Sequence, residues 1–322
     1  MEKVRKTVAV ATGEGAIPPH TSSDQELEAV AASLSLVPED ELHINGDPDS
    51  PPHSLSLLHT AAMCRNIPLA ELLLSHGGDP WEGRLMGAEG GHPVALALFY
   101  AATEMARFLA GEDEDATRVG IREAAGLGWN LDPYFHPETQ GLTPAARKGF
   151  AFYRPIPAFP ELDERSAKDD QVVLDEALSW AARNNQIGSM ERLVAAGAVP
   201  NAIPYGGTPL LWAIYSDSED AAAWLLQAGA DPDLVHDFGG SSHGKSATAL
   251  HLAAQYESLA CLRLLLDAGA STDIKDAAWN GTPLDWAVHC QAPRSEAILR
   301  AHVGLDKATT STSSSTASPS TA

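Results

Sequence analysis

The chain has 322 residues, of which 43 are Asp or Glu and 21 are Lys or Arg, so its formal net charge is −22. This acidity argues against binding to nucleic acid or to an anionic membrane, because both depend on Lys and Arg that neutralise phosphates. Apolar residues make up 44% of the chain, which is enough for a folded core. Its three cysteines are widely spaced and no long apolar run occurs. We therefore expect no disulfide framework, transmembrane helix or secretory signal, and a location in the cytoplasm, with the nucleus as the alternative.

The first part of the chain, residues 1–50, is rich in Pro, Gly and Ser and predicts mostly irregular structure. One short helix is expected there, over residues 24–36. At the other end, residues 306–322 are almost entirely Ser, Thr and Ala after the first few positions. This composition predicts a disordered tail, because it offers too little apolar surface to form a core.

Six segments after residue 50 share one pattern that predicts two short helices. In the fuller copies a Thr can cap the start of the unit, an Ala pair allows close packing, leucines follow at helical spacing, or a glycine ends the second helix. The copy that begins at His92 keeps only the first part of the pattern. A single pair of this size cannot bury its apolar face alone, so the units must stack. The segments begin at Ser56, His92, Glu176, Thr208, Thr248 and Thr282.

The clearest copy of the pattern is Thr248-Ala249-Leu250-His251-Leu252-Ala253-Ala254, which leads to Ala268-Gly269-Ala270. Thr208-Pro209-Leu210 and Thr282-Pro283-Leu284 repeat its start, and Ala228-Gly229-Ala230-Asp231-Pro232 repeats its end. Over roughly 56–110 and 174–302 the chain resembles the ankyrin-repeat family. The resemblance implies an all-α solenoid of stacked helix-turn-helix units with projecting hairpin loops. It also implies that the usual role is to bind other proteins, and that His59 and His251 bond neighbouring backbone.

The repeats are interrupted, so we divide the predicted fold into blocks. Residues 51–110 form a first block of two repeats, and 173–305 form a second block of four. The segment 111–172 between them is either a non-repeat connector or a degenerate repeat. It contains a repeat-like start at Gly141-Leu142-Thr143-Pro144, but the prolines at 155, 157 and 160 would stop a second helix.

The loop Asp233–Ala247 contains an insertion whose residues 239–246, GGSSHGKS, match the phosphate-binding pattern GxxxxGK[ST]. A true phosphate-binding loop connects a buried strand to a helix, and the sequence around this loop predicts neither. We interpret it as a flexible hairpin insertion. An alternative is that Lys245 and the loop amides contact an acidic partner.

No catalytic or metal-binding set can be assembled from the sequence. The histidines lack metal-ligand spacing, and no basic residue is placed to activate a cysteine. We therefore predict no catalytic residue, no metal and no cofactor.

The predicted partner-binding residues follow from position. In the family, the two residues after the Ala pair usually lie on the concave face of the array. Here they are Met63 and Cys64, Phe99 and Tyr100, Arg183 and Asn184, Tyr215 and Ser216, Gln255 and Tyr256, and His289 and Cys290. Aromatic side chains are enriched at binding hot spots, so we expect contact from the aromatic members and from neighbouring hairpin residues. The predicted set is Phe99, Tyr100, Tyr205, Tyr215, Phe238, His243, Tyr256, Trp279 and His289.

These residues predict a non-enzymatic interaction module that holds a protein or peptide in the concave groove. The acidity of the chain predicts a basic or amphipathic partner. The main alternative is an enzyme or a small-molecule binder, including a nucleotide binder, with its pocket near 111–172 or at the 239–246 loop. A third interpretation is a targeting subunit whose terminal segments are regulated.

Overall fold

The structure, a computed structural model, describes residues 23–35, 56–82, 91–112, 114–148, 169–237 and 245–313. For Tyr205 and residues 305–313 it describes the backbone alone. The chain forms two compact units, which we call unit 1 (Met1–Val199) and unit 2 (Pro200–Ala322). Within the described ranges the only β-structure is two isolated bridges, so the predicted all-α fold class is confirmed.

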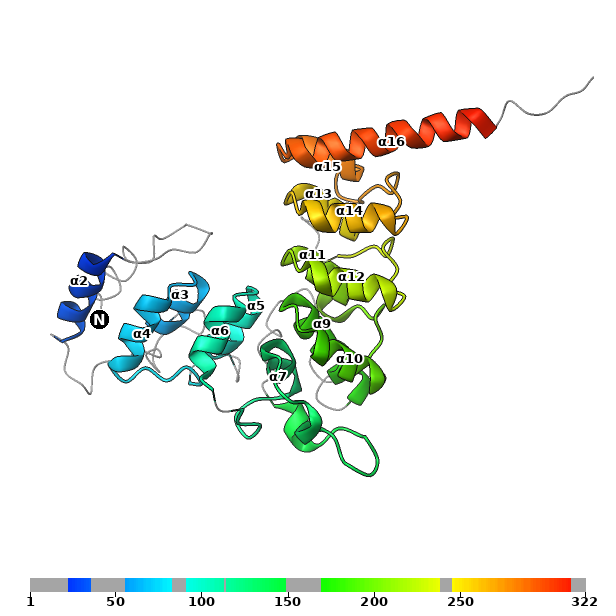
Figure 1. Cartoon of the computed structure of the whole chain (residues 1–322). Coiled ribbons are helices and arrows are strands. Elements are labelled where there is room, and N and C mark those ends of the chain that lie inside the picture. Colours follow the sequence, from blue (N-terminus) through cyan, green and yellow to red (C-terminus); the bar gives the residue numbers. More distant parts are fainter. Residues whose placement is uncertain are drawn as a thin grey trace, which may run out of the picture. The chain divides into compact units, whose positions relative to one another are not determined.

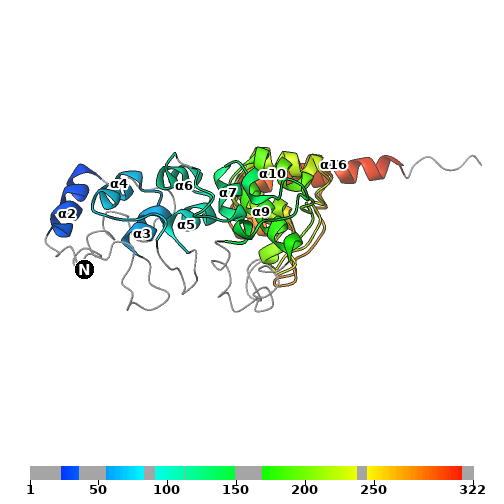
Figure 2. The ribbon, with the colours of Figure 1, turned by 90° about the horizontal axis from the view of Figure 1, so that it is seen from below.

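Unit 1 begins with helix α2 (Asp24–Leu34), which confirms the short helix expected over 24–36. Three helix pairs follow in its described residues, each joined by a short turn (Figure 1). The first helices of the pairs lie in one layer and the second helices in another (Figure 2). The pairs are α3 (Leu57–Met63) with α4 (Ile67–Ser75), α5 (Pro93–Phe99) with α6 (Thr103–Ala110), and α9 (Asp170–Arg183) with α10 (Ile187–Ala195).

Unit 2 consists of three further pairs stacked in chain order, after the 3₁₀ turn η5 (Pro204–Gly206) (Figure 1). In its loops, the one described β-feature is an antiparallel bridge between His236 and Ala247, at the base of the 239–246 insertion. The pairs are α11 (Pro209–Tyr215) with α12 (Glu219–Gln227), α13 (Ala249–Gln255) with α14 (Leu259–Asp267), and α15 (Pro283–His289) with α16 (Pro293–Ser313).

Local sequence explains where these helices begin and end. The hydroxyl of Thr208 accepts a hydrogen bond from the N–H of Leu211, so it caps α11 as predicted. Pro209 occupies the first position of that helix, where a missing N–H costs no hydrogen bond. After the second helix of the pair, Gly229 adopts a φ of 89°, a left-handed conformation that glycine reaches without a Cβ clash.

Packing between the pairs depends on small and histidine side chains. Ala253 and Ala254 are fully buried, which lets neighbouring helices approach closely. In the same repeat, Nε2 of His251 lies 3.1 Å from the carbonyl oxygen of Gly281, which immediately precedes the next repeat. The equivalent His59 lies 2.7 Å from the carbonyl oxygen of Gly91. The structural role expected for these histidines is therefore confirmed.

The interrupting segment contributes one α-helix, α7 (Ile121–Leu127), and the 3₁₀ turns η2 (Asp132–Tyr134) and η3 (Pro144–Arg147) in its described part. Helix α7 packs against α5, α6, α9 and α10. The end of turn η3 lies close to the start of α7. A Cβ at Gly120, the residue before α7, would collide with the carbonyl oxygen of Lys148, the residue after η3. Residues 149–168, which include the three prolines, lie outside the described residues.

Two buried charges connect α7 to α9. Arg122 and Glu176 form an ion pair in which both side chains are 1% exposed. The neighbouring Glu123 is fully buried, and neither of its carboxylate oxygens has a hydrogen-bond partner among the described residues. Burial raises the pKa of Glu123 to about 7. The interrupting segment is therefore joined to the repeats by polar as well as apolar contacts.

The predicted boundaries 51–110, 111–172 and 173–305 stay predictions. The division after Val199 falls within the predicted second block, between α10 and η5. Residues 306–313 of the predicted tail lie within the bounds of α16, and 314–322 lie outside the described residues.

Candidate functional site

In unit 1, Phe99 and Tyr100 end helix α5, and both are half-buried. Their rings meet edge to face, with centroids 4.9 Å apart. The guanidinium carbon of Arg183 lies 4.7 Å from the centroid of the Phe99 ring. Arg183 also donates to the carbonyl oxygen of Phe99 at 2.7 Å, and Arg65 donates to that of Tyr100 at 2.8 Å. These contacts hold both residues in place within unit 1.

The positional expectation is wrong for Arg183 and Asn184, which follow an Ala pair but are buried in unit 1. Arg183 covers the Phe99 ring, as described above. The amide of Asn184 donates to the carbonyl oxygens of Leu98 and Trp180, at 3.1 and 3.0 Å. The end of α9 therefore packs on the end of α5, and these two side chains serve the fold.

In unit 2, Tyr215 and Tyr256 come together on the ends of α11 and α13. Their exposed fractions are 36% and 51%, and their ring centroids are 6.0 Å apart in an edge-to-face arrangement. Trp212, which is 8% exposed, packs against Tyr215, and the centroids of the two rings are 5.9 Å apart. Burial, followed by the nearby Tyr215 and Cys290 groups, raises the pKa of Tyr256. Tyr256 therefore links this aromatic pair to the end of α15.

Two more predicted residues, Trp279 and His289, line one cavity of about 430 Å³ in unit 2. Trp279 is 55% exposed, and its ring centroid lies 5.5 Å from that of the buried Trp286. The remaining lining residues are Gln255, Asn280, Gly281, Asp285, Trp286 and Cys290. We call Tyr215, Tyr256 and this cavity the aromatic surface of unit 2.

The carboxylate of Asp276 organises the wall of this cavity. One oxygen accepts the indole N–H of Trp286 at 2.9 Å and the N–H of Gly281 at 2.9 Å. The other accepts the N–H groups of Ala278 and Trp279 at 2.8 and 2.7 Å. Burial of Asp276 opposes its ionisation, but these hydrogen bonds outweigh burial and lower its pKa. The loop that carries Trp279 is therefore preorganised.

Three predicted residues cannot be placed in this way. Phe238 and His243 lie outside the described residues, as do 239–244 of the GGSSHGKS motif, and the side chain of Tyr205 is not described. At the edge of the motif, the carbonyl oxygen of Lys245 accepts the N–H of Ala277 at 2.8 Å. The described residues beside the motif form turns and a bridge, with no strand that could precede a phosphate-binding loop.

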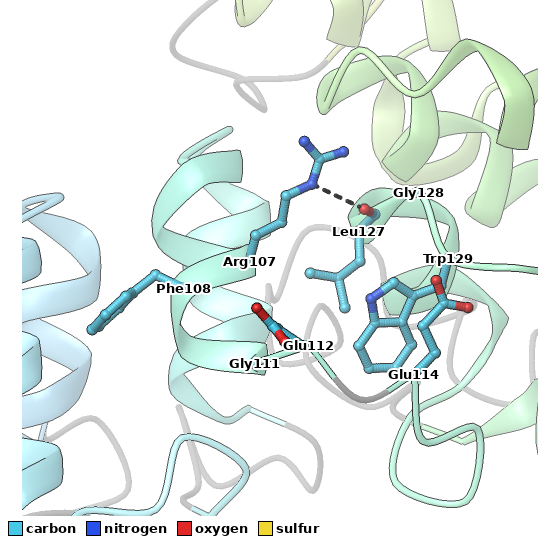
Figure 3. Close-up of a pocket in the computed structure, with 8 residues that line it drawn as sticks. All are labelled: Arg107, Phe108, Gly111, Glu112, Glu114, Leu127, Gly128 and Trp129. Atoms are coloured by element: carbon cyan, nitrogen blue, oxygen red, sulfur yellow. Dashed lines mark hydrogen bonds between the residues drawn. The ribbon is translucent and has the colours of Figure 1, made fainter.

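A second cavity, of about 530 Å³, lies in unit 1 beside the interrupting segment (Figure 3). Arg107 of α6 crosses it and donates to the carbonyl oxygen of Leu127 at 3.2 Å. Trp129 lies next to Glu114, whereas Phe108 points away from both. The ring of Trp129 is 6.1 Å from that of Trp81. The alternative hypothesis of a small-molecule binder placed its pocket near residues 111–172, and several residues of this cavity belong to that segment.

Burial shifts the pKa of several titratable groups in the described residues. Burial lowers the pKa of His59 and His251, brings that of His92 to about 3 together with the effect of His59, and brings that of His236 to about 4. Burial also raises the pKa of the Cys290 thiol. No group of three or more His, Cys, Asp or Glu in the described ranges could hold a metal ion. Among those ranges, none of the helices is long and apolar enough to cross a bilayer.

Sequence reasoning missed four residues of the cavity: Asn280, Gly281, Asp285 and Trp286. Trp286 and Asp285 belong to α15, where Trp286 is buried and Asp285 takes part in the capping box. The missed signal is the short spacing between Trp279 and Trp286. These two tryptophans are seven residues apart, so one lies in the loop and the other in the helix that follows it. Gln255 and Cys290 were identified by position but not selected, because neither is aromatic.

Residues 162–236 match the family described as "Ankyrin repeats (3 copies)", and residues 246–277 match the family described as "Ankyrin repeat". Inversin from Mus musculus is 33% identical over 121 residues, which are 37% of this chain and 11% of inversin. Cyclin-dependent kinase 4 inhibitor B from Rattus norvegicus is 32% identical over 113 residues, 35% of this chain and 82% of that relative. Protein PhlB from Serratia liquefaciens is 40% identical over 81 residues, 25% of this chain and 33% of PhlB.

The chain belongs to the ankyrin-repeat family. The match with the rat kinase inhibitor covers most of that relative, and the helix pairs have the architecture that the repeats predicted. The chain spans only about a tenth of the length of inversin. These similarities therefore establish the repeat family.

Proposed function

We propose that this chain is a non-enzymatic protein-interaction module that binds a basic or amphipathic peptide or protein segment on the aromatic surface of unit 2. The observation that carries the proposal is the exposure of Tyr215, Tyr256 and Trp279 in one unit, above a buried second row formed by Trp212 and Trp286. Exposed aromatic rings on a rigid support provide contact area at a low cost in conformational entropy.

The charge of unit 2 supports the choice of partner. Residues 200–300 contain twelve Asp or Glu and five Lys or Arg. Asp217 and Glu257 follow the two exposed tyrosines in the same turns, where Glu257 is paired with Arg294. Opposite charge on the partner would steer association and make it sensitive to salt. The name of one relative states that it inhibits a kinase, which is an action on another protein.

A peptide-display selection against the full chain tests this proposal. We expect enriched peptides to carry net positive charge together with aromatic or aliphatic residues, and to lose at least about tenfold in affinity for Tyr215→Ala/Tyr256→Ala. The matched control is Tyr215→Phe/Tyr256→Phe, which keeps both rings and should keep most of the affinity. Selected peptides that bind the alanine variant equally well, or that are mainly acidic, would contradict the proposal.

The alternative function, small-molecule binding, has one specific observation in its favour, the cavity beside Trp129 in unit 1. Arg107 is already engaged there with Leu127 and Gln186, so ligand entry would compete with contacts that hold α6. A fragment screen that follows the Trp129 indole resonance would detect such a ligand. A fragment that binds this cavity in the wild-type chain but not in Trp129→Ala would favour the alternative.

A further inference from the structure

We propose that the cavity between Trp279 and α15 is a receptor for a single arginine side chain of the partner. This inference rests on the proposed function, because it assigns one subsite of the aromatic surface of unit 2. The cavity holds about 430 Å³, and its lining combines aromatic, acidic and amide groups from α13, α15 and the loop between α14 and α15. Each kind of group matches one part of a guanidinium.

The aromatic wall matches the flat face of a guanidinium. Trp279 is more than half exposed, yet its backbone N–H is bonded to Asp276 and its ring rests against Trp286. Indole is the most favourable partner for a cation placed over an aromatic face, and arginine stacks on it more readily than lysine. The ring is therefore held in position before a ligand arrives.

The polar groups match the edge of a guanidinium. Oε1 of Gln255 is buried and accepts no hydrogen bond from any described residue. A donor that enters the cavity would satisfy this acceptor after a rotation of the amide group. Asp285 is exposed, and the hydrogen bonds from the backbone and hydroxyl of Thr282 both end on its Oδ2. Its Oδ1 remains for a second donor, and arginine presents several donors in one plane.

The net charge at the cavity also favours a cation. Asp276 lies behind the wall and is held ionised by its hydrogen bonds, and Asp285 lies at the cavity itself. Thr282 and then Lys275 lower the pKa of Asp285, so this carboxylate is charged at neutral pH. Lys275 is the nearby opposing charge. Its removal should therefore strengthen the binding of an arginine.

The first experiment titrates the isotope-labelled full chain with N-acetyl-arginine amide and follows the indole N–H resonances of Trp279 and Trp286 by NMR. We expect saturable shifts of both resonances, with an affinity of about millimolar for one isolated side chain. The control ligand is N-acetyl-citrulline amide, which has nearly the same shape and no charge. It should bind at least about tenfold more weakly.

Variants then separate the contributions. Trp279→Ala should lower the affinity for the arginine derivative about tenfold, and Gln255→Leu should lower this affinity severalfold. Lys275→Ala should raise the affinity about twofold. The control variant Glu71→Gln changes an exposed residue of α4 in unit 1 and should leave this titration unchanged. Equal shifts with citrulline, shifts confined to other residues, or retention of affinity in Trp279→Ala would each overturn the receptor assignment.

The two proposals can fail separately. If display-selected peptides depend on Tyr215 and Tyr256 but not on Trp279 or on any arginine, the interaction surface stands and the arginine receptor falls. If the arginine derivative binds the cavity while no selected peptide depends on the tyrosines, the receptor stands as a local site and the proposed function falls.

Discussion

One position in the repeat has opposite outcomes in the two units. Phe99 in unit 1 and Tyr215 in unit 2 are both the last residue of the first helix of their repeats. In unit 1 the next repeat contributes Arg183 over the Phe99 ring, with hydrogen bonds that fix the ends of α5 and α9. In unit 2 the next repeat contributes Tyr256, which leaves both tyrosine rings open to solvent. The neighbouring repeat thus decides whether an aromatic side chain is covered or remains exposed.

The units also differ in how charge is used. Unit 1 buries the pair Arg122–Glu176 and the single carboxyl of Glu123, all around α7. In the described residues of unit 2 the ion pairs lie nearer the surface, as between Arg300 and Glu296 in α16, and the buried carboxylate of Asp276 is held by hydrogen bonds instead of a cation. A buried charge is stabilising only while its partner is present, so unit 1 should be the more sensitive unit to single substitutions and to pH.

The largest expected effect is the loss of the buried ion pair. Glu176→Gln leaves Arg122 charged and buried without its carboxylate, which should lower the free energy of unfolding of unit 1 by about 4 kcal/mol. Urea unfolding with segment-resolved hydrogen exchange would measure this loss and assign it to α7 and α9. The control, Glu296→Gln, removes an i,i+4 surface pair and should cost at most about 0.5 kcal/mol. Equal effects would remove the contrast between the units.

The second effect is the pH dependence caused by Glu123. Its pKa is raised from 4.5 in the unfolded chain to about 7 in the fold, so the folded state retains the proton over this range. The stability of unit 1 that depends on Glu123 is fully present below pH 4.5 and is lost as the pH rises towards 7, by about 3 kcal/mol. The difference between wild type and Glu123→Leu isolates this contribution from the histidines. A difference that does not change with pH would show that the pKa of Glu123 is the same in the folded and the unfolded chain.

The third effect tests the aromatic comparison directly. Phe99→Ala should destabilise unit 1 by about 2 kcal/mol, because it removes the ring under Arg183, and should leave peptide binding unchanged. Tyr256→Ala should cost unit 2 less than about 1 kcal/mol and should reduce peptide binding about tenfold. Thermal unfolding and a binding titration of both variants would measure the two quantities. If Phe99→Ala reduced the free energy of peptide binding by more than it reduced the free energy of unfolding, the division of roles would be wrong.

The smallest effect concerns the side chain that covers Phe99. Arg183→Lys keeps a positive charge but loses the planar stacking and the directed hydrogen bond to the Phe99 carbonyl oxygen. We expect a loss of about 1 kcal/mol and faster hydrogen exchange at the end of α5. Unchanged exchange at this site would show that charge alone provides the contact.

Much of the fold could be predicted because its signals are local. The caps at Thr208 and Thr282, the proline that follows each, and the left-handed Gly229 act within a few residues of their own position. Their spacing repeats along the chain, so the helix pairs and their stacking follow from the sequence. The interrupting segment was less predictable, because α7 lacks the repeat pattern and its charged residues at 122 and 123 resemble those of an exposed helix.

The candidate site was predicted in part for a related reason. Tyr215, Tyr256, Trp279 and His289 were found by repeat position and residue type, and the structure brings them to one unit. Position alone could not show that Trp286 and Asp285 line the same cavity as Trp279, because one is also a packing residue and the other a helix cap. Those double roles depend on the hydrogen bonds by which Asp276 joins the loop of Trp279 to the Trp286 side chain.

By itself, the sequence determined which segments become helix pairs, since capping, helical spacing and glycine termination act over a few residues. Tertiary structure alone decided which side chains the pairs cover. Arg183 reaches Phe99 across 84 residues of sequence, and Arg122 meets Glu176 across 54. Whether an arginine is buried or an aromatic ring is open depends on the side chain that the neighbouring element places against it, and no local pattern encodes that choice.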